Sequence, residues 1–107
     1  MDELTLKELC KVCGVSRRAV QGYEKHGLVR ATGKTNRGYL LYDSEAQVRV
    51  AKIKRYQDYG FSIKEIKIIF ENPSEIQKSL LLEKLDELIS KREKVDECIK
   101  EIKIMIE

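Results

Sequence analysis

Two adjacent arginines follow a serine in the stretch SRRAVQGYEKHGL, which spans residues 16–28. Ser16 is a favoured N-cap residue, so Arg17 and Arg18 are predicted to lie in the first turn of a helix. A guanidinium group there can donate paired hydrogen bonds to a guanine or hold a phosphate. The free amides of the helix start also suit a phosphate oxygen. These groups can therefore bind anions and the edges of nucleic-acid bases.

Further along the chain, other polar residues offer the same chemistry. Gln21 lies one helical turn after the arginines, and Tyr23 serves either packing or contact with the same ligand. Residues 29–42 favour extended structure with glycine turn points, which predicts a small two-stranded wing with a basic tip. A later predicted helix start brings two more lysines. The candidate DNA-binding residues are Ser16, Arg17, Arg18, Gln21, Tyr23, Lys34, Arg37, Tyr39, Lys64 and Lys67.

The charge of the chain is unevenly distributed. Residues 1–72 hold 14 Lys and Arg against 9 Asp and Glu, whereas residues 73–107 hold 7 against 9. The densest part, residues 17–37, has six basic residues and one acidic residue, Glu24. Such a cluster is the electrostatic footprint of a polyanionic partner. On charge alone, a solvated surface that happens to be basic fits equally well.

Catalysis and metal binding find little support in the sequence. Cys10 and Cys13 form a CxxC pair that would suit half a zinc site or a redox couple. A closed zinc site needs four ligands, and His26 and Cys98 lie at no matching spacing. Residues i and i+3 share a helix face, which favours two small core residues. No nucleophile–base set or phosphate-binding glycine loop is found, so we expect no enzyme activity, no metal and no cofactor.

Short helices must position the basic residues. Four predicted capping boxes mark helix starts. The first helix is expected over residues 6–12, and Gly14 then suits a tight turn before Ser16, giving a helix-turn-helix pattern. A third helix should bury Val50 and Ile53 and stop at Gly60. The four boxes are Thr5 with Glu8, Ser44 with Gln47, Ser62 with Glu65, and Ser74 with Gln77.

From Ser74 to about Met105 the chain contains no helix breaker. Apolar residues recur at alternating steps of four and three, which is typical of a coiled-coil seam, with Arg92 as the polar exception. A helix of this length, ~48 Å, exceeds what the preceding residues can cover, so we expect a homodimer. The stripe widens at both ends, which favours an antiparallel pair. The expected dimer interface contains Leu81, Leu85, Leu88, Arg92, Val95, Ile99, Ile102 and Ile106.

Three segments resemble the MerR family of bacterial transcription regulators in order and spacing. They are GVSRRAVQGYEKHGLV, GYLLY and YGFSIKEIKIIF, and with the first helix they cover about residues 4–72. The resemblance implies a mainly α fold: a winged helix-turn-helix DNA-binding domain (residues 1–72) followed by a dimerisation helix (residues 73–107) that forms an antiparallel coiled coil. It also implies a homodimer on a palindromic promoter whose spacer is distorted, with RNA polymerase as a possible partner.

The chain departs from the family pattern at two places. Gln21 and Gly22 replace an arginine and a tyrosine, and Leu40 follows Tyr39 where an arginine is common. These changes keep two alternatives open: a DNA-architectural or excisionase-like protein, or a protein-interaction adaptor on a DNA-binding fold. The sequence ends with the long helix, so we expect either a short form without an effector domain or a truncated form of a longer regulator. With no signal peptide and no membrane span, we expect a cytoplasmic protein.

Overall fold

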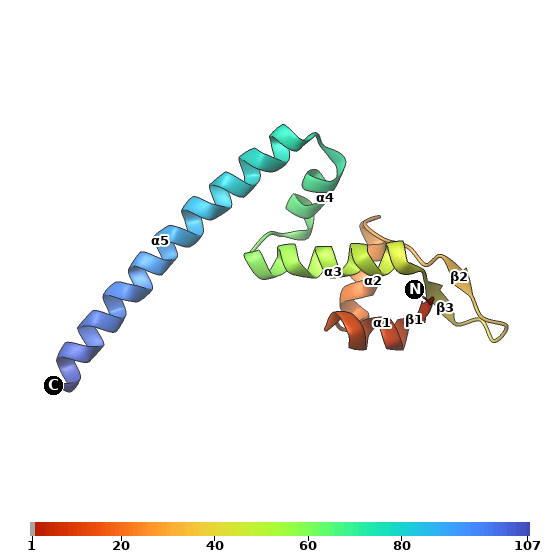
Figure 1. Ribbon diagram of the computed structural model, residues 1–107, viewed down its shortest axis with the longest axis horizontal. Coiled ribbons are helices and arrows are strands. Elements are labelled where there is room, and N and C mark those ends of the chain that lie inside the picture. Colours follow the sequence, from red (N-terminus) through yellow and green to blue (C-terminus); the bar gives the residue numbers. More distant parts are fainter. Residues whose placement is uncertain (1) are drawn as a thin grey trace. The chain divides into compact units, whose positions relative to one another are not determined.

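The computed structural model describes residues 2–107, which form five helices and three short strands (Figure 1). The chain divides into two compact units, residues 1–68 and 69–107. The fold is mainly α, as predicted. In chain order the elements are β1 (Leu4–Thr5), α1 (Leu6–Cys13), α2 (Arg17–Lys25), β2 (Gly33–Lys34), β3 (Leu40–Tyr42), α3 (Ser44–Tyr59), α4 (Ile63–Glu71) and α5 (Ser74–Ile106).

The first unit has its own apolar core. Val50 and Ile53 of α3 are fully buried, as their spacing predicted. Helical periodicity places Val20 and Tyr23 on the inner face of α2 in the same way. Burial of each such side chain contributes roughly 1.5–3 kcal/mol to folding. The other fully buried large side chains of this unit are Leu9, Leu28, Tyr42 and Ile66.

A tight turn at Gly14 joins α1 to α2. Gly14 has φ +67°, in the left-handed region where a side chain is disfavoured. Its amide and that of Val15 both donate to the carbonyl of Cys10, which closes the end of α1. The predicted helix-turn-helix is therefore confirmed, and Ser16 begins the second helix directly after the turn.

Two of the four predicted capping boxes form. Thr5 and Glu8 bond reciprocally at the start of α1, and Ser62 and Glu65 do so at α4. The box at Ser44 was wrong: Asp43 is the N-cap of α3 and accepts from the Ala46 amide at 2.9 Å. Aspartate caps a helix as well as serine does, which leaves Ser44 inside the first turn.

The box at Ser74 was also wrong. Pro73 is the N-cap of α5, and no side chain caps this helix. Ser74 is already helical, and the Gln77 side chain instead donates to the carbonyls of Ile69 (2.8 Å) and Asn72 (3.1 Å). A proline before the first turn fixes φ near its helical value and can start the helix in place of a serine.

The wing is a sheet of three short antiparallel strands in the order β1-β3-β2. The predicted hairpin of β2 and β3 pairs Gly33 with Leu41 and Lys34 with Leu40. The unpredicted third strand, β1, pairs Leu4 with Tyr42 along the other edge of β3. Two residues carry no alternating pattern, so only pairing with β3 identifies them as a strand.

The second unit is dominated by α5, a helix of 33 residues. At 1.5 Å per residue it is ~50 Å long. None of its residues is buried. The length agrees with the predicted helix, and the exposed apolar side chains lie where the seam was expected. Among the described residues, no helix is both long and apolar enough to cross a membrane.

Candidate nucleic-acid interface

Helix α2 presents a polar face opposite its buried one. The Ser16 hydroxyl accepts from the Ala19 amide at 3.0 Å, which confirms Ser16 as the N-cap. Because Val20 and Tyr23 point inward, the exposed positions at the N-terminal end of α2 are Ser16, Arg17, Arg18 and Gln21. The side chains of the last three make no hydrogen bond or ion pair among residues 2–107, so these polar groups are available to a ligand.

Tyr23 is placed differently from its neighbours on α2. Its side chain is only 2% exposed, and its hydroxyl donates to Gln57 Oε1 at 2.6 Å. Burial is the main cause that raises the pKa of Tyr23, so the hydroxyl stays protonated and keeps donating. Its observed role is to fasten α2 to α3, and we therefore leave it out of the contact set proposed below.

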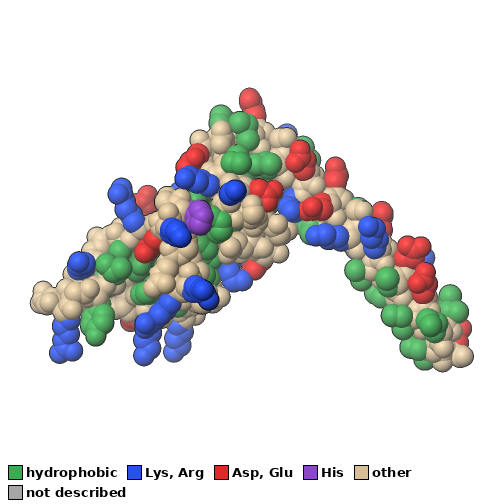
Figure 2. Space-filling model, turned by 180° about the vertical axis from the view of Figure 1, so that it is seen from behind, with side chains coloured by type: hydrophobic (Ala, Val, Ile, Leu, Met, Phe, Trp, Pro, Cys, Tyr) green, Lys and Arg blue, Asp and Glu red, His purple; other side chains and the backbone are tan. Residues whose placement is uncertain are grey.

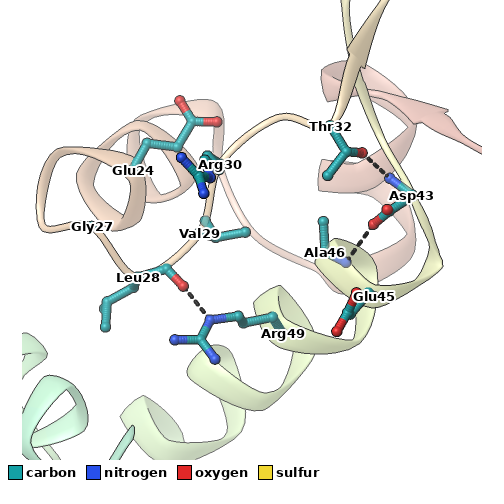
Figure 3. Close-up of a pocket in the computed structure, with 10 residues that line it drawn as sticks. All are labelled: Glu24, Gly27, Leu28, Val29, Arg30, Thr32, Asp43, Glu45, Ala46 and Arg49. Carbon is teal, nitrogen blue, oxygen red and sulfur yellow. Dashed lines mark hydrogen bonds between the residues drawn. The ribbon is translucent and has the colours of Figure 1, made fainter. Parts of the chain in front are cut away.

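The C-terminal end of α2 is held by polar contacts around a surface pocket of about 430 Å³ (Figure 3). Arg49 of α3 reaches across this pocket, and its Nε donates to the Leu28 carbonyl. Glu24 accepts a hydrogen bond from the Tyr42 hydroxyl of β3, and burial with this contact raises the pKa of Tyr42. These links join residues far apart in the chain, which is why the sequence did not reveal them.

Three hydrogen bonds hold the tip of the wing in shape. The Thr35 amide donates to the Tyr39 carbonyl at 2.8 Å, and the Gly38 amide donates to the Thr35 carbonyl at 2.9 Å. The Tyr39 amide donates to the Thr35 hydroxyl at 3.1 Å. Gly38 has φ +86° and so permits the turn. Lys34, Arg37 and Tyr39 are all exposed on this ordered loop, with the Tyr39 side chain 64% exposed.

The remaining two basic candidates lie on α4. Lys64 and Lys67 are exposed, and the Ser62–Glu65 capping pair fixes the helix start from which they project. Figure 2 shows several Lys and Arg side chains projecting from the lower edge of the first unit, and others elsewhere on the same face. A surface rich in cations suits a polyanionic partner.

A depression of about 470 Å³ separates the first turn of α2 from the wing. Arg17 and Tyr39, both expected in the interface, line it together. Lys7 of α1 lines it as well, and the sequence analysis missed this residue. Lys7 stands outside the dense basic cluster, and only the pairing of β1 with β3 brings the start of α1 beside the wing.

Gly22 leaves an open, half-buried position on α2, in a shallow hollow that Gln57 of α3 and Ile63 of α4 also line. A Cβ atom built at Gly22 would meet no other atom within 4 Å. The residue has no positive φ, so the backbone does not require a glycine there. His26 lies one turn later, with its Nδ1 2.9 Å from the Gly22 carbonyl oxygen at the C-terminal end of the helix.

The cysteines of the CxxC pair are half-buried free thiols. Cys13 Sγ lies 3.9 Å from the Gln47 carbonyl, a weak contact that fits a core thiol. Burial raises the pKa of Cys13, which disfavours the thiolate that metals and redox partners need. Within residues 2–107, no three His, Cys, Asp or Glu side chains are grouped as metal ligands.

On α5 the predicted seam faces solvent. Its seven apolar members range from 40% exposed at Leu81 to 77% at Ile106, and Arg92 is exposed as well. Leu82, Ile104 and Met105 widen this apolar surface near the two ends of the helix. An exposed stripe of this extent marks an interaction surface.

Comparison with known families gives two overlapping matches. Residues 4–72 match the model of the MerR helix-turn-helix family of regulatory proteins, and residues 47–104 match a model described as MerR, DNA binding. The chain is 29% identical over 97 residues to the transcriptional activator mta of Bacillus subtilis. It is 37% identical over 59 residues to the mercuric resistance operon regulatory protein of Bacillus cereus.

These matches cover most of this chain but less than half of the two relatives. The aligned part is 91% of the chain and 38% of the mta activator, and 55% of the chain and 45% of the mercuric resistance regulator. The mta activator, the mercuric resistance regulator and a third relative, HmrR of Sinorhizobium medicae, are named as regulators and not as enzymes.

Solved structures show the same fold. The N-terminal part of the Bacillus subtilis multidrug transporter activator superimposes with a TM-score of 0.71 at 27% identity, covering 96% of this chain and 97% of that one. A MerR-family regulator from Bacillus cereus gives 0.75 at 22% identity, with 92% and 76% covered. A regulator described as lacking the sensor domain and bound to promoter DNA gives 0.73 at 17% identity, with 92% and 80% covered.

Proposed function

Because the chain belongs to the MerR family of helix-turn-helix regulatory proteins, we propose that it is a sequence-specific DNA-binding regulator of transcription that acts as a homodimer. The observation that carries the proposal is the outer face of α2. There a capped helix start presents two exposed arginines, and its opposite face is fixed in the core. A rigid helix that offers unpaired guanidinium groups matches the geometry of a major-groove reader.

We assign base reading to the first turn of α2. Arg17, Arg18 and Gln21 would enter the major groove, where an arginine pairs with guanine and a glutamine with adenine. Ser16 and the amides beside it would hold a phosphate. Each good bidentate pair contributes about 1–3 kcal/mol of discrimination against a wrong base.

The wing and α4 would position the domain on the duplex. Lys34, Arg37 and Tyr39 reach from the wing, and Lys64 and Lys67 from α4. Contacts of this kind go to phosphate and carry no sequence information by themselves. They would set the register of α2 and make the affinity strongly dependent on salt.

The seam of α5 supports an antiparallel homodimer. The seam positions are separated alternately by four and three residues, and this spacing is the same from either end of the helix. The centre of the pattern lies between Glu93 and Lys94. An antiparallel partner then places Arg92 opposite Val95, where its methylene stem can pack and its charge can reach water. A parallel pair in register would set the two Arg92 side chains face to face. The remaining antiparallel pairs are Leu81 with Ile106, Leu85 with Ile102, and Leu88 with Ile99.

A symmetric dimer implies a palindromic site, because each half-site then meets the same residues. Family resemblance extends the proposal to a promoter site whose spacer the dimer distorts, with RNA polymerase bound beside it. A related fold has been solved bound to promoter DNA, which supports this extension. Promoters with spacers one or two base pairs shorter would test it, because a protein that corrects the spacer should lose its effect on them.

The central experiment is selection of duplexes from random DNA with the full chain, followed by anisotropy titration of the enriched sequence. We expect an enriched palindrome that binds at least about 1,000 times more tightly than unrelated DNA. This factor, the specificity ratio, is roughly 10³ or more for proteins that bind a specific DNA sequence. Arg18→Ala should lower that ratio by about 10- to 100-fold per half-site, since one base contact is lost in each.

Lys25→Ala is the matched control. Lys25 is also an exposed cation of α2, but it lies in the last turn, at the opposite end of the helix from the proposed reading turn. Enrichment of no sequence, or equal specificity of Arg18→Ala and the unmodified chain, would contradict the proposal and favour a protein-interaction role.

A further inference from the structure

The depression between α2 and the wing is built from three separate elements. Lys7 comes from the first turns of α1 and Arg17 from the first turn of α2, whereas Gly38, Tyr39 and Leu40 belong to the wing. Thr5 and Leu6 complete a hollow of about 470 Å³. It lies directly beside the arginine turn that we propose as the base reader.

The cations of this depression are uncommitted. Among the described residues, neither the Lys7 nor the Arg17 side chain has an ion-pair or hydrogen-bond partner. Glu8, the acid next to Lys7 in sequence, is instead bound to Thr5: its carboxylate accepts from the Thr5 amide at 2.9 Å and from the Thr5 hydroxyl at 3.0 Å. Two unpaired positive charges at one hollow favour an anionic ligand.

The other residues of the depression suit an apolar group attached to that anion. Leu6 and Leu40 are half-buried and expose part of their side chains to the hollow, and the Tyr39 ring is 64% exposed. A DNA strand has this mixed character, since each phosphate is joined to deoxyribose, whose carbon face can pack against leucine and tyrosine. A free inorganic anion would leave these apolar surfaces uncovered.

We propose that this depression holds one nucleotide unit of the DNA backbone, with Lys7 bound to its phosphate and Leu40 packed against its sugar. Lys7 thereby supplies the charge that the wing lacks at position 40. Arg37, the other basic residue close to Leu40 in sequence, does not line the depression. The inference rests on the proposed function, because it adds a phosphate contact to the same DNA interface.

Lys7→Gln tests the contact directly. Binding of the full-length variant is titrated against the duplex enriched in the selection and against an unrelated duplex of equal length, between 50 and 300 mM KCl. Loss of one phosphate contact lowers the slope of log K against log salt by about 0.9 for each half-site. We expect affinity to fall roughly 3- to 10-fold per half-site on both duplexes, which leaves the specificity ratio unchanged.

Two further variants separate charge from structure. Lys7→Arg keeps the charge and should keep the slope. Lys11→Gln removes a charge from the same helix at an exposed position outside the depression. It should therefore change the salt slope and the affinity only by the small amount that any loss of one positive charge causes. Equal melting temperatures of Lys7→Gln and Lys11→Gln would show that both variants are folded.

Leu40→Arg completes the test, because it puts a cation back into the depression from the wing side. If Lys7 and the introduced arginine contact the same phosphate, adding Leu40→Arg to Lys7→Gln should return the slope of log K against log salt to that of the unmodified chain. Leu40→Arg alone should increase the slope of the unmodified chain by less. Equal gains in the two backgrounds would contradict a shared phosphate, and a slope of Lys7→Gln equal to that of Lys11→Gln would overturn the contact. Specific binding lost in Arg18→Ala but intact in Lys7→Gln would then leave the proposed function standing.

Discussion

The two units of the chain bury their apolar side chains to very different extents. In the first unit, short helices and a small sheet surround residues such as Val20, Val50 and Ile53, which are completely buried. In the second, α5 is more than twice as long as any other described helix and has no buried residue. A helix gains most of its stability from packing an apolar face. The first unit finds that packing within itself, whereas the apolar seam of α5 is exposed and would be packed in the proposed dimer.

Leu88→Asp, in the exposed seam of α5, should have the largest effect of the substitutions that test this difference between the units. A carboxylate in the centre of the seam has to be desolvated in the dimer, so we expect the dimer to dissociate. Light scattering should give the mass of one chain in place of two. Affinity for the palindromic duplex should fall roughly 100-fold or more, because the two half-sites are then bound independently.

Ser90→Asp is the control for that variant, since Ser90 is exposed on α5 outside the seam. It should leave the mass unchanged. A monomeric mass for the unmodified chain at micromolar concentration would contradict the interpretation of α5.

Ile53→Ala tests the other side of the comparison. Ile53 is fully buried in α3, so its truncation leaves a cavity, and the free energy of unfolding should fall by about 2–4 kcal/mol. Val48→Ala, on the same helix but 62% exposed, should change it by less than about 0.5 kcal/mol. Urea denaturation at one fixed protein concentration measures both. Similar losses in the two variants would mean that the first unit lacks a defined core.

Substitution by alanine should change the stability of the protein in opposite directions at two glycines of the first unit. Gly22→Ala should stabilise the protein by roughly 0.5–1 kcal/mol, because Gly22 lies inside a helix and has free space around it. Gly14→Ala has equal space but φ +67°, so it should destabilise the protein by roughly 1 kcal/mol. Thermal denaturation compares them, and a loss of stability in Gly22→Ala would show that this helix needs its glycine.

The same open position predicts a functional gain. Gly22→Tyr should strengthen DNA binding, because it adds an aromatic side chain in the same hollow as Arg18, at a position where the sequence departs from the family pattern. Anisotropy titration on unrelated DNA measures this effect. Unchanged or weaker affinity would count against it.

The smallest expected effect is the contribution of the capping box at the start of α1 to the stability of the protein. The carboxyl of Glu8 accepts hydrogen bonds from Thr5, which lower its pKa below the usual value of 4.5. A lowered pKa in the folded state gives stability that is present above pH 4.5 and is lost as the pH falls through the folded-state pKa. The difference in melting temperature between the unmodified chain and Glu8→Ala should therefore shrink between pH 5 and pH 2.5. A constant difference would exclude the carboxylate as its source.

Local patterns predicted most of the helices and the buried positions on them. Helical spacing placed Val50 and Ile53 in the core, and Ser16 was identified as the cap of α2 because a cap depends on residues within one turn. The same local reasoning failed at Ser44 and Ser74. In each case the preceding residue takes the N-cap position, Asp43 with a side-chain cap and Pro73 without one, so short motifs locate a helix start only to within a residue or so.

Contacts between distant residues were out of reach of these patterns. The sequence left Tyr23 between packing and DNA contact, and its bond to Gln57 of α3 shows the packing role. Arg49 binds the Leu28 carbonyl across 21 positions of the chain. Neither partner can be inferred from spacing, because the pairing depends on how α2 and α3 cross.

The sequence by itself determined the helix-turn-helix, the basic character of α2 and the wing, and the unpaired seam of α5, because charge, caps and apolar periodicity are properties of neighbouring residues. Tertiary structure decided which side chains share a surface. It buried Tyr23 beside Arg18 and Gln21, which stay exposed, and it brought Lys7 of α1 to the same depression as Arg17 and Tyr39. The physical reason is strand pairing: β1 joins β3, and this contact between the two ends of the first forty residues sets the start of α1 against the wing.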